Sequence, residues 1–442
     1  MMKLIFYMIM LIFLIFKFME FNYFYSMLLL LLILKVLFIF NFNSYYMLIY
    51  GNLGIDIISF MLILLVLWIF FLVFMVKNFF KKKIYFFNLF LLMLILYLCF
   101  CWMNLFMFYL FFEVSLIPIF FLIMGWGYQP ERVKASLYML FYTLFFSLPL
   151  LILIFLIYNF NKTLFFVFLN YFSMEELWDP VIYLVMFMGF LVKLPIFMFH
   201  NWLPKAHVEA PLVGSMVLAA IMLKLGGYGL YRFIDLMKLN FLLMNDFMIN
   251  LSIIGLVIIS ILCLRHYDMK VIVAYSSVVH MGMMLIGFMT LKFWGFLGGL
   301  FMMISHGICS SSLFYLVNLF YERTKSRSLL MNKGLVFFIP SMMLFWFLLC
   351  MNNMASPVSL NLLSELMIVS VVLNWSIEIM IILIVGMFFS ACYSLYLFSF
   401  SFHGIFNSFM VKIFSCKVLE FYLVIFHFIP LNFLILKMNF LI

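Results

Sequence analysis

Apolar stretches close to the ~20 residues needed to cross a bilayer follow one another along the whole of this 442-residue chain. The chain is 70% hydrophobic and 9% charged, and its mean hydropathy is +1.31, which is far outside the range of soluble domains. No soluble domain fits between the apolar stretches. The sequence therefore predicts one all-α polytopic membrane bundle, stabilised by the packing of helices within lipid.

The apolar stretches divide into about 14 transmembrane helices, and two of them are interrupted. The predicted spans are residues 4–17, 23–42, 54–76, 84–102, 104–124, 133–158, 181–200, 213–234, 247–264, 271–291, 293–320, 334–373, 376–401 and 418–436. The seventh contains Pro195 directly after Lys193-Leu194. The twelfth is too long for one crossing and contains the sequence MNNMASP at residues 351–357. Because proline removes a backbone donor and clashes with the preceding turn, we expect broken helices 7 and 12.

Two broken helices in corresponding halves of a membrane chain are typical of inverted repeats with an ion path near the bilayer midplane. We therefore interpret spans 4–8 and 9–13 as repeats. The predicted domains are three N-terminal helices in residues 1–95, an antiporter-like core in residues 96–401 and a C-terminal helix in residues 402–442.

The composition indicates where the chain is made. Phe (64), Met (40) and Tyr (24) are abundant, as AT-rich codons produce, and Met rises further where AUA encodes methionine. This bias points to an animal mitochondrial genome. Residues 1–17 lack the Arg- and Ser-rich character of a transit peptide and the small-residue site of a signal peptide, so we expect them to form the first span.

Positive charge is distributed unequally between the two predicted sides. Loops that follow odd-numbered spans contain sixteen Lys and Arg residues, whereas the other loops and the termini contain six. The positive-inside rule then places the richer side in the matrix and both termini towards the intermembrane space. The net charge of +10 is explained by this topology and does not indicate binding to nucleic acid.

Four ionisable residues lie deep inside apolar stretches: Glu113, Lys193, Lys224 and Glu365. A charge there costs at least about 2.5–3.5 kcal/mol, so such residues usually face partners or water and have a function. For Glu113 the alternative is a hydrogen bond to a neighbouring helix, and for Lys193 it is snorkelling to the interface. Lys193 adjoins the first break and Glu365 follows the second, as in transporter coupling sites.

Histidines form a second group of candidates. His280 and His306 lie in the middle of the tenth and eleventh spans. They either bond across helices or pass protons between Lys224 and Glu365, because imidazole changes its charge near neutral pH. The remaining histidines are structural or access-path candidates: His200, His207, His266, His403 and His427. For Lys35 we expect snorkelling or contact with another subunit. The seven cysteines show no CxxC pairing, and we expect no metal site.

Two stretches resemble a known family. HNWLPKAHVEAP at residues 200–211, followed by VGS at 213–215 and the Lys224 segment, is similar to the NADH:ubiquinone oxidoreductase chain 4 family of respiratory complex I. Supporting matches are FEVSLIP at 112–118, SSVVH at 276–280, SHG at 305–307 and NLLSE at 361–365. The resemblance covers essentially the full length, and is weakest before residue 90 and after residue 400.

The resemblance implies a proton-translocating, antiporter-like subunit of the mitochondrial inner membrane. NADH-to-ubiquinone electron transfer would drive it from other subunits, which would hold NADH, FMN, iron–sulfur clusters and ubiquinone, with no cofactor in this chain. The implied partners are other membrane subunits, especially neighbouring antiporter-like chains, and lipids such as cardiolipin. The implied proton relay comprises Glu113, Lys193, Lys224, His280, His306 and Glu365. Glu365 stands where sister subunits have lysine.

Three other functions remain as alternatives. A standalone cation/proton antiporter would share the architecture but would need no redox partner. A haem protein would use a histidine pair on two helices, and His266 and His280 are the only candidates. A purely structural scaffold would leave the buried ionisable residues without an explanation.

Overall fold

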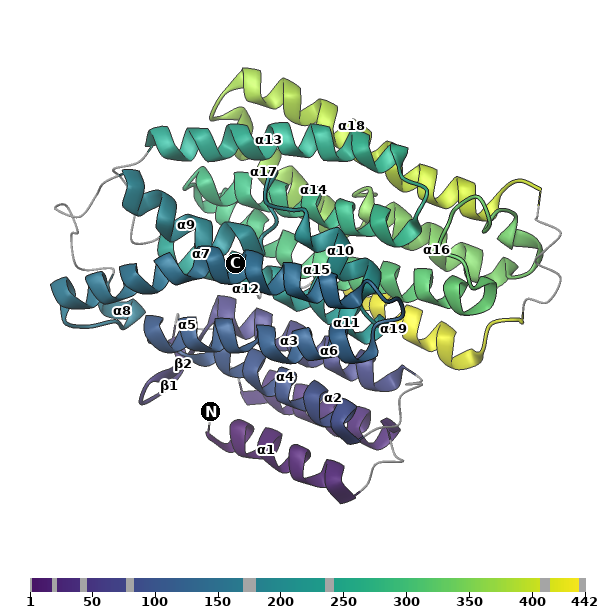
Figure 1. The fold of residues 1–442 in the computed structure, drawn as a ribbon. Coiled ribbons are helices and arrows are strands. Elements are labelled where there is room, and N and C mark those ends of the chain that lie inside the picture. The colour runs from purple at the N-terminus through teal and green to yellow at the C-terminus, as the bar shows by residue number, and fades with distance from the viewer. Residues whose placement is uncertain are drawn as a thin grey trace. The chain divides into compact units, whose positions relative to one another are not determined.

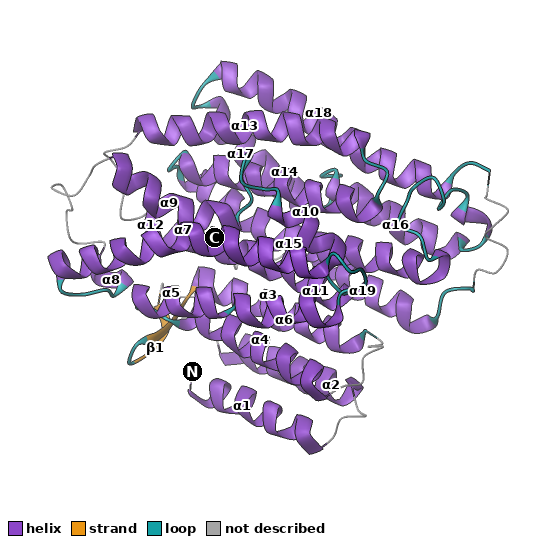
Figure 2. Cartoon of the chain, in the orientation of Figure 1, coloured by secondary structure: helices purple, strands orange, loops and turns teal. Residues whose placement is uncertain are grey.

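The computed structural model describes residues 2–17, 22–39, 46–76, 83–169, 180–234, 242–405 and 414–436. Helices make up nearly all of this part of the chain (Figure 2). The chain separates into two compact units. Unit 1 comprises Met1–Lys193 and Glu209–Asn240, and unit 2 comprises Leu194–Val208 and Phe241–Phe440. The division between the units falls directly after Lys193, at the predicted first break.

Unit 1 contains the first six spans, the first half of the seventh and the eighth (Figure 1). Its elements are α1 (Met2–Lys17), α2 (Asn22–Ile39), β1 (Tyr46–Tyr50), β2 (Leu53–Asp56), α3 (Ile57–Met75), α4 (Lys83–Cys101), α5 (Leu105–Val114), α6 (Leu116–Trp126), α7 (Arg132–Asn161), α8 (Phe166–Leu169), α9 (Pro180–Lys193), α11 (Leu212–Val217), the π-helix η2 (Leu218–Met222) and α12 (Leu223–Ile234).

Unit 2 contains the second half of the seventh span and the ninth to fourteenth spans. Its elements are α10 (Trp202–Glu209, whose last residue belongs to unit 1), α13 (Leu242–Arg265), α14 (Met269–Met289), α15 (Phe293–Thr324), the 3-10 helix η4 (Leu335–Phe337), α16 (Pro340–Asn353), α17 (Leu360–Leu373), α18 (Ile377–Phe402) and α19 (Val418–Phe433).

Each predicted span contains at least one helix of the described residues, with differences at the boundaries. Within the described residues, ten helices are long and apolar enough to cross a membrane. Three shorter apolar helices, Tyr23–Leu37, Pro180–Lys193 and Leu360–Leu373, belong to predicted spans 2, 7 and 12. The prediction of an all-α, roughly fourteen-helix membrane fold is confirmed.

Both predicted breaks are present. After α9 ends at Lys193, the backbone turns through Pro195 and a left-handed residue, Met198 (φ 81°), before α10 begins. After α16 ends at Asn353, Ala355 and Val358 have φ values of 58° and 68°. Pro195 at the first break and Pro357 at the second cannot donate the hydrogen bond that would continue the helix.

A side-chain hydrogen bond spans the second break. The Asn361 amide Nδ2 donates to the carbonyl oxygen of Asn352 at 2.7 Å. Ser359 caps α17, because its Oγ accepts from the N–H of Leu362. The backbone groups that the break frees are thus satisfied by side chains inside the protein, as membrane depth requires.

A β-hairpin precedes α3, where the prediction began a helix at residue 54. Strands β1 and β2 pair in antiparallel fashion around Gly51, whose φ of +58° suits the turn. The helix starts only after Asp56, whose backbone N–H donates to Ser59 Oγ at 2.7 Å. Asp56 is the N-cap of α3 and is buried.

Candidate functional site

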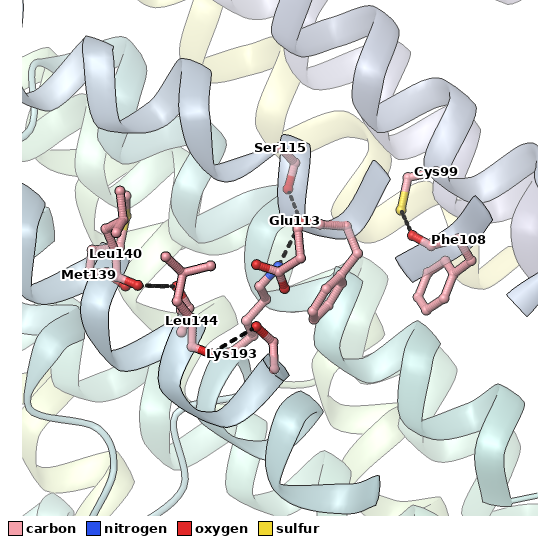
Figure 3. A network of polar contacts seen from close by, with 11 residues as sticks. Cys99, Phe108, Glu113, Ser115, Met139, Leu140, Leu144 and Lys193 are labelled. Atoms are coloured by element: carbon pink, nitrogen blue, oxygen red, sulfur yellow. Dashed lines mark hydrogen bonds and ion pairs between the residues drawn. The ribbon is translucent and has the colours of Figure 1, made fainter. Parts of the chain in front are cut away.

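Unit 1 places Lys193 and Glu113 together inside the helix bundle. Lys193 is the last residue of α9 and Glu113 lies near the end of α5. Lys193 Nζ is 3.7 Å from Glu113 Oε1, and the two side chains are 3% and 14% exposed (Figure 3). This burial excludes snorkelling for Lys193. The structure therefore places an acidic side chain beside Lys193 at the broken helix.

Phe112 completes the surroundings of the lysine. Lys193 Nζ donates to the carbonyl oxygen of Phe112 at 2.7 Å and lies 3.0 Å from the centre of the Phe112 ring. The Oγ of Ser115 donates to the same carbonyl at 2.7 Å. Ser115 separates α5 from α6, three residues before Pro118, whose ring disfavours a continuous helix. An irregularity in the fifth span therefore faces the end of α9.

Lys224 is the second residue of α12, and α12 directly follows the π-helix η2. Its side chain is fully buried, and Nζ donates to the carbonyl oxygen of Ala219 in the π-helix at 2.8 Å. Single π-helical turns occur frequently at functional sites. Small residues, which let neighbouring helices approach closely, surround this lysine in the sequence: Ala219, Ala220, Gly226 and Gly227.

Unit 2 brings three of the predicted residues together. His280 Nδ1 on α14 is 3.8 Å from Glu365 Oε1 on α17. On its other side, the His280 ring centre is 5.4 Å from that of His306 on α15. All three residues are buried, and none is more than 6% exposed. His280 thus lies between an acid beside the second break and a second imidazole.

The other candidates lie away from these clusters. His207 stacks on Phe314 with ring centres 4.5 Å apart, and His200 and His266 both contact the Tyr275 ring. His427 bonds the Leu423 carbonyl one turn back on α19 through Nδ1. The His266 ring packs against the Tyr275 ring, whereas the His280 ring lies beside the Glu365 carboxylate.

Lys35 and His403 lie at the surface and at a helix end, respectively. Lys35 on α2 is exposed, and its Nζ lies 5.3 Å from the Tyr7 ring centre. His403 follows the last residue of α18.

One buried charge pair was missed by the sequence analysis. Asp56 at the start of α3 forms an ion pair with Arg232 on α12, and the two side chains are 2% and 6% exposed. Arg232 also donates to Tyr228 Oη at 2.8 Å. The sequence analysis counted Arg232 only among the six positive residues of the other loops and the termini, and the structure shows that it lies in α12 and is buried. The signal in the sequence is the four-residue spacing of Lys224, Tyr228 and Arg232.

Comparison with known proteins identifies the family. A family model described as NADH:quinone oxidoreductase/Mrp antiporter, TM, matches residues 102–390. A second, described as NADH-ubiquinone oxidoreductase chain 4, amino terminus, matches residues 1–101. The chain belongs to the NADH-ubiquinone oxidoreductase chain 4 family.

Curated relatives of this family agree over most of the length. The chain 4 protein of Ceratitis capitata is 50% identical over 400 residues, which are 89% of each chain. That of Aedes aegypti is 53% identical over 332 residues, covering 75% of this chain and 74% of the relative. That of Apis mellifera ligustica is 45% identical over 407 residues, covering 91% and 89%.

A solved structure shows the same fold. A chain of respiratory complex I from Thermus thermophilus with bound NADH matches with a TM-score of 0.84 and 21% sequence identity. The match covers 94% of this chain and 92% of that one. The resemblance inferred from HNWLPKAHVEAP and its companions is therefore confirmed at the level of family and of fold.

Proposed function

We propose that this chain is a proton-translocating membrane subunit of mitochondrial respiratory complex I. It belongs to a family of subunits of the NADH-ubiquinone oxidoreductase, and it contributes to that enzyme without redox chemistry of its own. The observation that best supports proton translocation is the presence of a buried acid–base pair at each broken helix: Lys193 with Glu113, and Glu365 with His280.

In unit 1, the proposed step is the separation of Glu113 from Lys193. Two unit charges about 4 Å apart attract with about 4 kcal/mol at an effective dielectric constant of 20. Moving one proton against the membrane potential costs about 2.3 kcal/mol per 100 mV. Loss of this attraction removes about 4 kcal/mol of stabilisation from the charged form of Lys193, so the lysine releases its proton. The event that separates the pair must come from a neighbouring subunit.

In unit 2, His280 would accept protons and pass them to Glu365. His280 has Glu365 on one side and His306 on the other, so either imidazole can exchange a proton with the carboxylate in short steps. Lys224 would supply protons to this cluster by way of water. We propose that the six residues act as one relay, Glu113, Lys193, Lys224, His280, His306 and Glu365.

The location and partners follow from the same proposal. The excess of Lys and Arg in the loops after odd-numbered spans supports a matrix position for those loops, with both termini towards the intermembrane space. Helices with exposed apolar residues, such as α7 and α18, suit contact with lipid such as cardiolipin or with neighbouring antiporter-like chains. NADH, FMN, iron–sulfur clusters and ubiquinone would be bound by other subunits.

The test is the proton stoichiometry of assembled complex I carrying Lys224→Ala. The relay predicts fewer protons pumped per NADH oxidised, because a lysine that the relay needs is lost. Pumping is measured in sealed vesicles and normalised to NADH oxidation. An unchanged stoichiometry in fully assembled enzyme would remove Lys224 from the relay.

A standalone cation/proton antiporter is the second candidate, and the description of the matching family model includes Mrp antiporters. Sodium flux through the isolated chain in liposomes, without redox partners, would favour that function over ours.

A further inference from the structure

The i, i+4 row on α12 extends beyond Lys224. Lys224, Tyr228 and Arg232 are each four residues apart, so they lie along one face of the helix, about 6 Å apart along the axis. All three are buried. The row starts at the lysine of the proposed relay and ends at Arg232, whose partner Asp56 begins α3. Arg232 and Asp56 both lie on the intermembrane-space side in the proposed topology.

Aromatic rings pack around Tyr228 and Arg232 in this row. The Tyr228 ring lies edge-on to Phe100 and Phe108, with ring centres 5.2 and 5.5 Å apart. The Arg232 guanidinium carbon lies 4.9 Å from the Tyr228 ring centre and 5.1 Å from that of Phe166. A constriction of rings that excludes water is a common way to gate a membrane path.

The Asp56–Arg232 pair is incompletely satisfied. Among the described residues, Asp56 Oδ1 receives no hydrogen bond and Arg232 Nε donates none. Buried charges without their full set of hydrogen bonds are costly, and such groups call for an explanation.

A second ion pair in the chain shows what a static pair looks like. In unit 2, Arg323 pairs with Glu420, and its Nε and Nη1 donate to the carbonyl oxygens of Phe414 and Leu319. Glu420 also accepts from the backbone N–H of Lys417 at 3.1 Å. Arg323–Glu420 therefore links α15 to α19, and hydrogen bonds to the backbone of Phe414, Leu319 and Lys417 hold the two side chains. In the Asp56–Arg232 pair, Asp56 Oδ1 and Arg232 Nε have no such bond among the described residues.

We propose that Asp56, Arg232 and Tyr228 form a proton gate at the intermembrane-space end of unit 1. In the closed state seen here, the guanidinium bridges Asp56 and Tyr228 and the rings exclude water. When Arg232 leaves Asp56, a proton that arrives from Lys224 binds Asp56 Oδ1 and then passes to water on that side. Return of Arg232 to Asp56 prevents backflow. The proposal rests on the proposed proton translocation, and it adds the release step.

The test compares Arg232→Gln, Asp56→Asn and the double variant in complex I reconstituted into vesicles. Two quantities are measured: the passive proton leak under an imposed pH gradient without NADH, and the protons pumped per NADH oxidised. For Arg232→Gln, which removes the residue that closes the gate, we expect a severalfold rise in leak and a lower ratio, with NADH oxidation per assembled complex unchanged. For Asp56→Asn and the double variant, which lack the carboxylate that takes up the released proton, we expect a lower ratio without added leak. Arg323→Gln is the matched control, and it should leave the leak unchanged.

The double variant keeps the test decisive where single variants assemble poorly, because it leaves no unpaired buried charge. If leak and pumping ratio per assembled complex equal those of the wild type in the double variant, the cluster is only a fastening between α3 and α12, and the gate is refuted. Failure of the proposed function is read separately. Normal pumping by Lys224→Ala would refute the relay, while the leak still reports on the gate.

Discussion

The two broken helices present the same chemistry with the roles exchanged. In unit 1 the base, Lys193, ends the helix before the break, and the acid, Glu113, comes from another helix. In unit 2 the acid, Glu365, follows the break, and the base, His280, comes from another helix. Within the proposed repeats, span 5 corresponds to span 10 and span 7 to span 12. The same two positions are therefore used in each half, with acid and base exchanged.

This exchange has a physical consequence. Separation of the pair in unit 1 leaves a buried cation that favours loss of its proton, whereas separation in unit 2 leaves a buried carboxylate that favours gain of one. Protons released in the first half would thus be accepted in the second. Two identical pairs would instead compete for protons or for vacant sites.

Loss of the unit 1 base should have the largest effect. Lys193→Met leaves Glu113 as a buried unpaired carboxylate, at a cost of about 3–5 kcal/mol, so assembly and pumping should both fall. Adding Glu113→Gln should restore assembly, measured as the amount of intact complex, and should not restore pumping. Lys35→Met on the exposed face of α2 is the matched lysine control and should change neither. Recovery of pumping in the double variant would contradict the assigned role of Lys193.

Loss of the partner residues should have an intermediate effect and tests the symmetry directly. Glu113→Gln and His280→Gln each retain a polar side chain of similar reach and leave the residue at the break in place. We expect both to reduce the proton stoichiometry, measured in vesicles, by less than loss of Lys193. A reduction for only one of them would show that the two pairs do not act equivalently.

The smallest effect should come from the hydrogen bond across the second break. Asn361→Leu removes one donor to the Asn352 carbonyl, which keeps the longer bond from the Ala355 N–H at 3.3 Å, so we expect a cost of about 0.5–1.5 kcal/mol. The midpoint of thermal inactivation of the solubilised complex should fall, with the pumping ratio of the intact enzyme little changed. Asn374→Leu, at the other end of α17, serves as the control, since it is not part of the break. An unchanged midpoint would show that the break is held by other contacts.

The sequence predicted the helices and both breaks because membrane burial and proline act locally. Apolar length determines a span, and Pro195 and Pro357 mark the two breaks, although proline alone does not decide the outcome, because α7 continues through Pro149. The pairing of Lys193 with Glu113 was also accessible, because a buried charge requires a partner.

Other features depend on tertiary contacts and could not be predicted. The β-hairpin before α3 is too short and apolar to be distinguished from the start of a helix. The π-helix before Lys224 cannot be distinguished from an α-helix by its residue composition. The burial of Arg232 could not be predicted, because an arginine near a span end usually lies at the membrane surface, and only the fold shows that Asp56 is its buried partner.

The most direct test of the account is the number of protons pumped per NADH oxidised by fully assembled enzyme carrying Glu365→Gln. Glutamine preserves the shape of the side chain beside His280 and cannot bind or release a proton at neutral pH. We predict a lower ratio with electron transfer to ubiquinone retained. A ratio equal to that of the wild type would show that the acid at the second break carries no protons, and the account of paired sites at the two breaks would fail.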